Sequence, residues 1–501
     1  MQRVPATHSR VSKRDRWFNH QNCVAAHMSG AESIDWDQLS EFVEGMWEDS
    51  ALPSLSDFIR IPALSPAFDD DWAANGHLDA TIDLFTGWLE TIEMEGLKAN
   101  VHRLAGRTPL LLCEVPGTGP GEVIFYSHLD KQPEFTGWSE GKGPWTPVRE
   151  GEWLYGRGAI DDGYGGYSAM LSVMALKQQG IAHPTCRFLI ETCEESGSPD
   201  LPFYLEELKE ELGNPDLVIV LDSGMGDYER FWITESLRGL VGGTLKVAVT
   251  SEGVHSGLGS GVIPSSFRIA RLLLSRLEEA ETGELLPEWL HIEISDQLRS
   301  DAGEIVAVLG DAIVSDFPLL DGVKAQHEDM TDALLAQNWM PTLSVTGADG
   351  MPPVSAAGNV LRTNTDLKLS VRIPPGVESV PTSVRLKALL EDNPPFGAHV
   401  EFEIDTPANG FSAPAMPSAL AEALNDASNR TFGNDAMPFY EGGTIPFLAM
   451  MQESYPAAHF LVTGCGGPGN NMHGPDEKLH VPTVKSVTQC VSAALAAMAD
   501  R

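Results

Sequence analysis

The chain has 501 residues, which is enough for two or three domains with cores of their own. Its 42% apolar and 21% charged residues are typical of a globular protein and exclude a disordered or fibrous one. Its 33 basic and 71 acidic residues give a net charge of −38, which repels nucleic-acid phosphates and anionic lipid headgroups, so we expect neither nucleic acid nor a membrane as a partner.

The first predicted elements belong to an α/β domain. Residues 1–30 are polar and basic, and we expect them to be a disordered extension. The next segment repeats apolar side chains at the spacing of a helix. Strands are then predicted over 123–127, 187–192 and 217–221, with a helix over 163–179 between the first two. Strands that alternate with helices favour a sheet with parallel strands.

The middle of the chain has a different pattern. Residues 244–252 and 366–374 alternate apolar and polar side chains, and a helical segment is predicted over 267–281. Strands that alternate by face, with helices on one side, indicate a smaller α+β domain. The interval 284–350 is long and irregular, and its pattern predicts no particular element.

The α/β pattern returns after about Thr406, with a strand over 459–462 and an Ala-rich helix over 484–499. We therefore predict an α/β fold with a mixed, mainly parallel sheet, interrupted by an inserted α+β domain. The predicted boundaries are an extension over 1–30, the first part of the α/β domain over 31–237, the inserted domain over 238–405 and the second part over 406–501.

Several features are typical of an intracellular protein. No apolar run approaches the roughly 18 residues of a membrane span, and no apolar segment of a secretory signal follows the basic N-terminus. The six cysteines are scattered and form no Cys-x-x-Cys pair, which favours reduced thiols in a chain of this size. We therefore expect a soluble, cytoplasmic protein.

Acid and imidazole side chains follow the predicted strands of the α/β domain. In open α/β sheets, ligands bind outside the carboxyl ends of the strands, so these side chains are expected to meet at one edge. The predicted set is His128, Asp161, Glu195, Asp222 and His473, of which Asp161 lies just ahead of the helix over 163–179.

This set is suited to two divalent metal ions. Two imidazoles and three carboxylates, with no thiolate, are ligands for zinc, with manganese or cobalt as alternatives. Two ions about 3.5–4 Å apart need a bridging group, which a carboxylate can supply and a histidine cannot, so Asp161 is assigned the bridge. A structural metal site is the alternative interpretation, although such sites usually complete their shell with cysteine.

Two further acids extend the predicted catalytic centre. Asp130 lies two residues after His128 and is expected to accept the second ring N–H of that histidine. In the adjacent pair, Glu195 is assigned to the metal and Glu194 to the bound water, as general base. Each side chain taken singly is more often structural or solvated, but their joint placement after strands favours catalysis.

Seven short stretches carry a resemblance to a known family. They are YSHLDKQP, LYGRGAIDDGYGG, ETCEESGS, VLDSG, VHSG, EGGTIP and HGPDEKL, spread from about residue 123 to 480. With them the chain resembles the dinuclear zinc peptidase family of acetylornithine deacetylase, succinyl-diaminopimelate desuccinylase, glutamate carboxypeptidase and the carnosinase-type dipeptidases. The resemblance implies the same five ligands and the same roles for Asp130, Asp161 and Glu194. It also implies a cis peptide after Asp161, a zinc-peptidase-like catalytic domain, and an inserted domain that serves as lid and dimerisation domain.

Within the inserted domain and just after it, the resemblance implies substrate contacts. Arg372 and Asn359 are expected to bind the C-terminal carboxylate of the substrate, whereas the residues alone would favour a solvated surface arginine. His255 is expected to polarise the scissile carbonyl, either in its own subunit or in the site of a dimer partner. Gly443 and Thr444 are expected to line the pocket, with a tight turn as the alternative role of the glycine.

The sequence therefore predicts a metal-dependent exopeptidase of dipeptidase or carboxypeptidase type, a homodimer through the lid domain. Metal-activated water would attack an amide bond next to a free carboxylate, with Glu194 taking the proton. The interval 284–350 and WMPTLSVTG resemble the carnosinase-type branch, which favours dipeptides.

An N-acyl amino acid deacylase with the same site is the alternative. A catalytically silent peptide-binding homologue is the rival from another class, and the intact Glu194 argues against it. Tyr164 and Tyr440 depart from the family pattern, and these departures bear on substrate preference.

Overall fold

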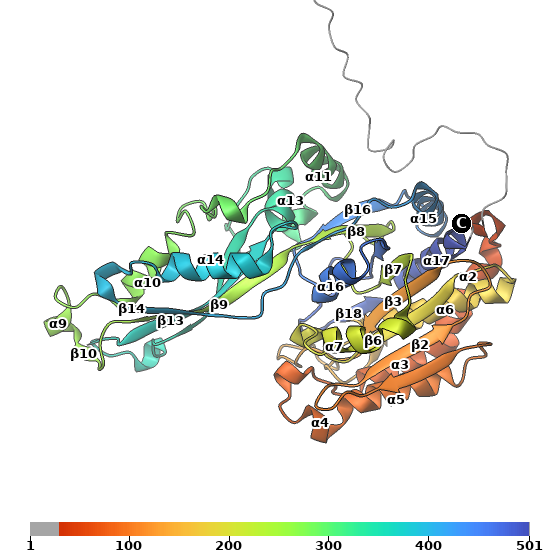
Figure 1. The fold of residues 1–501 in the computed structure, drawn as a ribbon, viewed down its shortest axis with the longest axis horizontal. Coiled ribbons are helices and arrows are strands. Elements are labelled where there is room, and N and C mark those ends of the chain that lie inside the picture. Colours follow the sequence, from red (N-terminus) through yellow and green to blue (C-terminus); the bar gives the residue numbers. More distant parts are fainter. Residues whose placement is uncertain (1–29, 500–501) are drawn as a thin grey trace, which may run out of the picture. The chain divides into compact units, whose positions relative to one another are not determined.

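The computed structural model describes residues 30–499, which form two compact units (Figure 1). Unit 1 comprises the described residues up to Thr234 together with 413–439 and those from 451 onward, and unit 2 comprises 235–412 and 440–450. The insertion expected from the sequence, over 238–405, lies inside the first segment of unit 2, and the sequence pattern did not indicate the second segment. The extension expected over 1–30 lies outside the described residues, apart from Gly30.

Unit 1 is built on a six-stranded sheet with the strand order β1-β2-β6-β3-β7-β17. Strands β6, β3, β7 and β17 run parallel to one another, whereas β2 is antiparallel to both of its neighbours. The prediction of a mixed, mainly parallel sheet is therefore confirmed. The strands are β1 (Lys98–His102), β2 (Leu110–Val115), β3 (Glu122–His128), β6 (Thr185–Glu191), β7 (Leu217–Val220) and β17 (His459–Val462).

Burial explains why the central strands are easy to find in the sequence. Strands β3, β6 and β7 are buried along nearly their whole length, so each forms a short apolar run. Helix α6 packs on β3, and α17 packs on α6 with buried residues all around its axis. The helices of this unit are α2 (Trp36–Met46), α3 (Leu52–Ile59), α4 (Trp72–Asn75), α5 (His77–Leu89), α6 (Gly165–Gln179), α7 (Leu201–Glu207), α8 (Lys209–Leu212), α15 (Ser418–Thr431) and α17 (Val481–Met498).

A small three-stranded sheet connects two distant parts of unit 1. Its order is β18-β5-β4, with both pairs antiparallel. The chain leaves β5 toward Asp161 and enters β18 shortly after His473, so this sheet brings the two predicted ligand loops together. The strands are β4 (Val148–Glu150), β5 (Trp153–Tyr155) and β18 (Lys478–His480).

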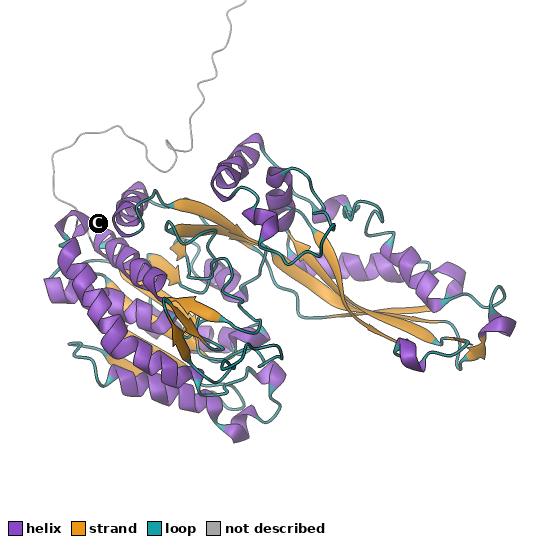
Figure 2. Ribbon diagram, turned by 180° about the vertical axis from the view of Figure 1, so that it is seen from behind, coloured by secondary structure: helices purple, strands orange, loops and turns teal. Residues whose placement is uncertain are grey.

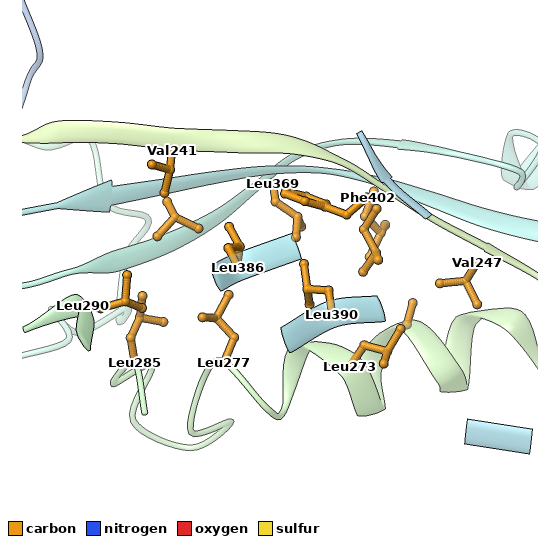
Figure 3. Packing of buried hydrophobic residues seen from close by; sticks show 14 of the residues in the cluster. Val241, Val247, Leu273, Leu277, Leu285, Leu290, Leu369, Leu386, Leu390 and Phe402 are labelled. Atoms are coloured by element: carbon orange, nitrogen blue, oxygen red, sulfur yellow. The ribbon is translucent and has the colours of Figure 1, made fainter. Parts of the chain in front are cut away.

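Unit 2 is a four-stranded antiparallel sheet in the order β11-β13-β9-β14, with helices α10 and α14 packed on one face (Figure 1 and Figure 2). Alternate residues of β13 are buried, as the alternating pattern predicts. Figure 3 shows the core between sheet and helices, where Leu369 and Phe402 meet Leu386 and Leu390. The inserted α+β fold is thus confirmed. These elements are β9 (Gly239–Ala248), β11 (Thr342–Asp349), β13 (Asn364–Ile373), β14 (His399–Ile404), α10 (Ser266–Leu274) and α14 (Ser379–Glu391).

The interval 284–350, which the sequence left unassigned, contains three α-helices joined by loops. It contains α11 (Asp296–Leu309), α12 (Ala312–Ser315) and α13 (Met330–Trp339) and leads into β11. The helix predicted over 267–281 ends at Leu274 instead. Leu277 continues the apolar spacing and is fully buried, but it reaches the core from a turn, just before Glu278 forms a β-bridge with Leu285.

The remaining elements are short or pass from one unit to the other. Strands β8 and β16 and helix α16 each have residues in both units. No helix within residues 30–499 is long and apolar enough to cross a membrane. These elements are β8 (Trp232–Leu237), β10 (Val254–His255), α9 (Ser256–Gly259), β12 (Val360–Leu361), β15 (Phe411–Ser412), β16 (Met437–Glu441) and α16 (Pro446–Ser454).

Candidate metal centre

Four neighbouring strands of the unit 1 sheet deliver polar side chains to the same edge. His128 is the last residue of β3, and Asp222 follows β7 by two residues. Glu194 and Glu195 open a short 3-10 helix after β6, and the chain from β17 leads to His473. Because β6, β3, β7 and β17 are parallel neighbours, their carboxyl ends lie side by side. The sheet thus brings together side chains that lie far apart in the sequence.

The first ligand group consists of His128, Asp161 and Asp222, and we call it group A. One donor atom from each residue lies within 4.8 Å of the other two. Nε2 of His128 lies 3.1 Å from Oδ1 of Asp161 and 3.6 Å from Oδ2 of Asp222. His128 and Asp161 are buried, and the side chain of Asp222 is 9% exposed. This spacing is what a small cation held by three ligands requires.

The second group, group B, consists of Asp161, Glu195 and His473. Its donor atoms also lie within 4.8 Å of one another. Nε2 of His473 lies 2.7 Å from Oδ2 of Asp161 and 3.4 Å from Oε2 of Glu195. Asp161 therefore turns one oxygen to group A and the other to group B, which is the arrangement of a bridging carboxylate. The peptide bond between Asp161 and Asp162 is cis, as the family resemblance implies.

Asp130 and Glu194 lie next to these groups. Nδ1 of His128 is 3.4 Å from Oδ1 of Asp130 and 3.2 Å from its backbone oxygen, so Asp130 faces the ring nitrogen expected from the sequence. The same carboxylate accepts hydrogen bonds from the backbone N–H groups of Glu194 and Glu195, at 3.1 and 3.0 Å. Asp130 thus fixes both the histidine and the turn of the glutamate pair, and the second contact was not predicted.

The centre crowds carboxylates into a buried space. Burial raises the pKa of Glu194, Glu195 and Asp222, and nearby carboxylates raise it further. Burial acts in the same direction on Asp161, but hydrogen bonds with His128 and His473 hold the pKa of that carboxyl well below its usual range. Mutual repulsion of this kind is relieved by a bound cation.

The donor set fits divalent cations. Imidazole nitrogens and carboxylate oxygens converge in two groups that share one residue, and no thiolate belongs to either group. Oε2 of Glu195 also accepts a hydrogen bond from Nε2 of Gln132 at 2.7 Å, which orients the carboxylate. Supporting contacts of this kind are typical of metal ligands.

Three supporting residues near the centre were missed by the sequence interpretation. Arg157 and Glu477 form a buried ion pair, and Arg157 also contacts the backbone of His473. Tyr164, which departs from the family pattern, is fully buried; its hydroxyl donates to the backbone oxygen of Leu221 and accepts from the N–H of Cys465 at 3.0 Å. The motif GRGAIDD contained Arg157, but only the fold shows its long-range partner.

The predicted residues of unit 2 fall into two places. His255 and Asn359 lie together at the short antiparallel pair of β10 and β12, where the N–H of Ser256 donates to the backbone oxygen of Asn359 at 2.9 Å. Nδ1 of His255 accepts a hydrogen bond from the N–H of Gly257, so the neutral ring carries its proton on Nε2. Both residues are exposed.

Arg372 and Thr444 meet near the other end of the sheet. Nη1 of Arg372 donates to Oγ1 of Thr444 at 2.7 Å, and that hydroxyl donates to the backbone oxygen of Arg238 at 2.6 Å. Gly442, next to the predicted Gly443, accepts a hydrogen bond from Nε of Arg238 at 3.2 Å. Burial, and after it the charge of Arg372, lowers the pKa of Arg238 to about 10. Arg238 is a second cationic residue at this place that the sequence interpretation did not single out.

Comparisons with known proteins bear on the whole arrangement. The sequence model of peptidase family M20/M25/M40 matches residues 124–498, which confirms the resemblance carried by the motifs. The cysteinylglycine-S-conjugate dipeptidase of Corynebacterium striatum is 26% identical over 377 residues, covering 73% of this chain and 78% of that one.

Solved structures give the same fold. The di-peptidase Dug1p of Saccharomyces cerevisiae matches with a TM-score of 0.76 and 19% identity, covering 95% of this chain and 100% of that one. An M20 family metallo-carboxypeptidase of Sulfolobus solfataricus matches with a TM-score of 0.72 and 19% identity, covering 90% and 100%. Both therefore share the architecture that places the strand-end residues together.

Proposed function

This chain belongs to peptidase family M20/M25/M40 and is a metal-dependent peptidase, and we propose that it hydrolyses dipeptides with two bound divalent cations, of which zinc is the expected metal. The proposal rests on one observation above all: two ligand groups share Asp161 beside a glutamate that neither group uses. The name of the Corynebacterium striatum relative, a dipeptidase, favours dipeptides over longer peptides.

Groups A and B would each hold one cation, and Asp161 would contact both. Such ions, when bound, polarise a carbonyl and lower the pKa of water from 15.7 to about 7. His128 and Asp222 are fixed by the ends of two paired strands, so group A needs little rearrangement. Asp130 holds the His128 ring through its Nδ1 side and leaves Nε2 toward the group.

Glu194 would act as the general base. Its backbone is fixed by Asp130, and its carboxylate belongs to neither ligand group. In the reaction it takes the proton of the attacking water and delivers it to the amine of the leaving residue.

Arg372 would bind the C-terminal carboxylate of the dipeptide. Its guanidinium is half-buried, and its hydrogen bond to Thr444 orients it. A guanidinium that is fixed in this way can form two parallel hydrogen bonds with a carboxylate.

His255 would act on the carbonyl in the site of a partner subunit. Asn359, which was expected to bind the substrate carboxylate with Arg372, lies beside His255 instead and would accompany it. Asn364 and Arg372 are eight residues apart on β13, about 27 Å at 3.4 Å per residue, and the β10–β12 pair with His255 lies beyond the Asn364 end. A dipeptide spans only about 7 Å. One subunit's Arg372 and His255 are therefore too far apart to contact one dipeptide, and a homodimer through unit 2 resolves this.

We place the protein in the cytoplasm. All five cysteines within the described residues are buried and free, as expected of thiols in a reducing compartment.

Glu194→Gln tests the assignment of the base. We expect kcat for a dipeptide to fall about 10²–10⁴-fold, because general base catalysis is lost, while the metal content stays that of the wild type. Glu210→Gln, an exposed glutamate of α8, is the matched control and should have no effect. If Glu194→Gln retained full turnover, the proposed mechanism would be wrong.

A further inference from the structure

A buried ion pair lies beside the metal centre without belonging to either ligand group. Arg157 is 1% exposed and Glu477 is fully buried, and Nη1 of Arg157 donates to Oε2 of Glu477. The other carboxylate oxygen, Oε1, accepts from the N–H of Gly158 at 2.8 Å. Because buried ion pairs add little net stability, the use of this one is better sought in what it positions.

The ion pair closes the base of two loops that carry metal ligands. Strands β5 and β18 are antiparallel partners, so the chain that leaves β5 runs beside the chain that enters β18. Asp161 lies four residues beyond Arg157, and His473 lies four residues before Glu477. The two loops meet again at their far ends, where Nε2 of His473 contacts Oδ2 of Asp161.

The other N–H groups of Arg157 hold the backbone next to the remaining ligands of group B. Nη2 donates to the backbone oxygens of His473 and Gly474, both at 3.1 Å. Nε donates at 3.1 Å to the backbone oxygen of Pro133, which follows Gln132, the residue that orients Glu195. All three ligands of group B are therefore connected to one guanidinium.

His473 needs this support in particular. Its φ of 61° lies in the left-handed region that residues other than glycine seldom adopt, and its side chain is 51% exposed. Such a backbone conformation persists only where surrounding contacts hold it. Two of those contacts come from Arg157.

Group A has a different support. His128 and Asp222 follow β3 and β7, whose ladder pairs Tyr126 with Val220, and Tyr164 binds the backbone just before Asp222. The contacts of Arg157 reach none of the residues that support group A. Among the ligands of that group, Arg157 is connected only to the shared Asp161, and only through the intervening chain.

We propose that Arg157, paired with Glu477, is the positioning residue of group B and sets the affinity of that site alone. This inference rests on the proposed two-cation function. Lysine cannot replace the arginine. The guanidinium is a rigid fork of N–H donors that contacts Glu477, His473, Gly474 and Pro133 together, and a single ammonium group cannot do this.

The test is a metal titration of the full chain carrying Arg157→Lys, in competition with a chromophoric chelator for Zn²⁺. This variant keeps the positive charge, so Glu477 retains a cationic partner and folding can be checked by thermal unfolding of the metal-free protein. We expect one equivalent to bind as in the wild type and the other to bind about 10–100-fold more weakly, the usual effect of losing an outer support of a ligand.

Two further variants make the result specific. Arg187→Lys changes another mostly buried arginine of unit 1, one that pairs with Glu122 at the opposite end of the strands, and should keep both equivalents. His473→Ala should lose the second equivalent, and adding Arg157→Lys to it should not weaken the remaining one.

Three outcomes would overturn the inference. Arg157→Lys could bind both equivalents as the wild type does, could weaken both equally, or could weaken the remaining equivalent in the His473→Ala protein. A wild-type chain that binds only one equivalent would instead contradict the proposed two-cation function, so the two failures are distinguishable.

Discussion

The two units differ in how they place the residues that the sequence singles out. In unit 1 all of the predicted ligands, drawn from residues 128 to 473, converge on one edge of the sheet. In unit 2 the predicted residues separate into the β10–β12 pair with His255 and a cluster around Arg372, at opposite ends of β13.

The difference follows from strand direction. Parallel strands all end at the same edge, so residues that follow them meet whatever their distance in sequence. Antiparallel strands end alternately at both edges, so functional residues at the ends of such strands are distributed over the length of the sheet. A site in unit 1 can therefore be complete within one chain, whereas under the proposed function the residues of unit 2 would serve two different sites.

The largest effect is expected from removing the residue on which unit 1 converges. Asp161→Ala removes the only ligand common to groups A and B, so the account predicts that both cations are lost and dipeptide cleavage falls to background. Asp222→Ala removes a ligand of group A alone and should leave one equivalent bound. Metal content after gel filtration measures both. If the two variants retained equal amounts of metal, the assignment of Asp161 as the bridging ligand would be contradicted.

The separation within unit 2 predicts that subunits complement one another. His255→Ala should lower kcat about 10²–10³-fold, as expected for the loss of one donor to a developing oxyanion. Mixing this variant with Glu194→Gln, followed by subunit exchange, should restore part of the activity, because one site of the mixed dimer has both groups intact. If the mixture stayed inactive after exchange was demonstrated, His255 would act within its own subunit.

A smaller effect is expected at the Arg372 cluster. Arg372→Met should cost about 1.5–3 kcal/mol in kcat/KM, the value of a hydrogen bond with a charged group, and mainly through KM. A dipeptide with an amidated C-terminus lacks the carboxylate, so for this substrate wild type and variant should be equal. A variant that is equally impaired on both substrates would show that Arg372 has another role.

The smallest effect on catalysis is expected from Tyr164→Phe. The change removes the hydroxyl that binds the backbone of Leu221 and Cys465 in the buried core of unit 1. Leaving two buried backbone groups unpaired should lower the free energy of unfolding by about 1–3 kcal/mol, while both cations remain bound. Chemical denaturation of the metal-free protein measures the first part. Unchanged stability would show that water replaces the hydroxyl.

Much of unit 1 was predictable because its signals are local. The buried strands β3, β7 and β17 are apolar runs in the sequence. His128 and Asp222 lie at the ends of β3 and β7, and a Gly-rich loop leads from β17 to His473. The roles of Arg157 and Glu477 were not predictable, because their contact joins residues 320 positions apart and depends on the pairing of two three-residue strands.

In unit 2, local pattern was a weaker guide. The alternating strands β9 and β13 were found, but helix α10 ended earlier than its apolar spacing suggested, because Leu277 reaches the core from a turn. Nothing in the sequence indicates that the β10–β12 pair with His255 and the cluster with Arg372 lie at opposite ends of one sheet. That separation depends on the register of the strands, which can be read only from the folded structure.

The most direct test of the account is the metal content of the purified chain, measured together with hydrolysis of dipeptides and N-acyl amino acids, with and without chelator. We expect close to two divalent ions per chain, and dipeptide cleavage that the chelator abolishes and added metal restores. Cleavage of N-acyl amino acids alone, or dipeptide cleavage that persists in metal-free protein, would contradict it.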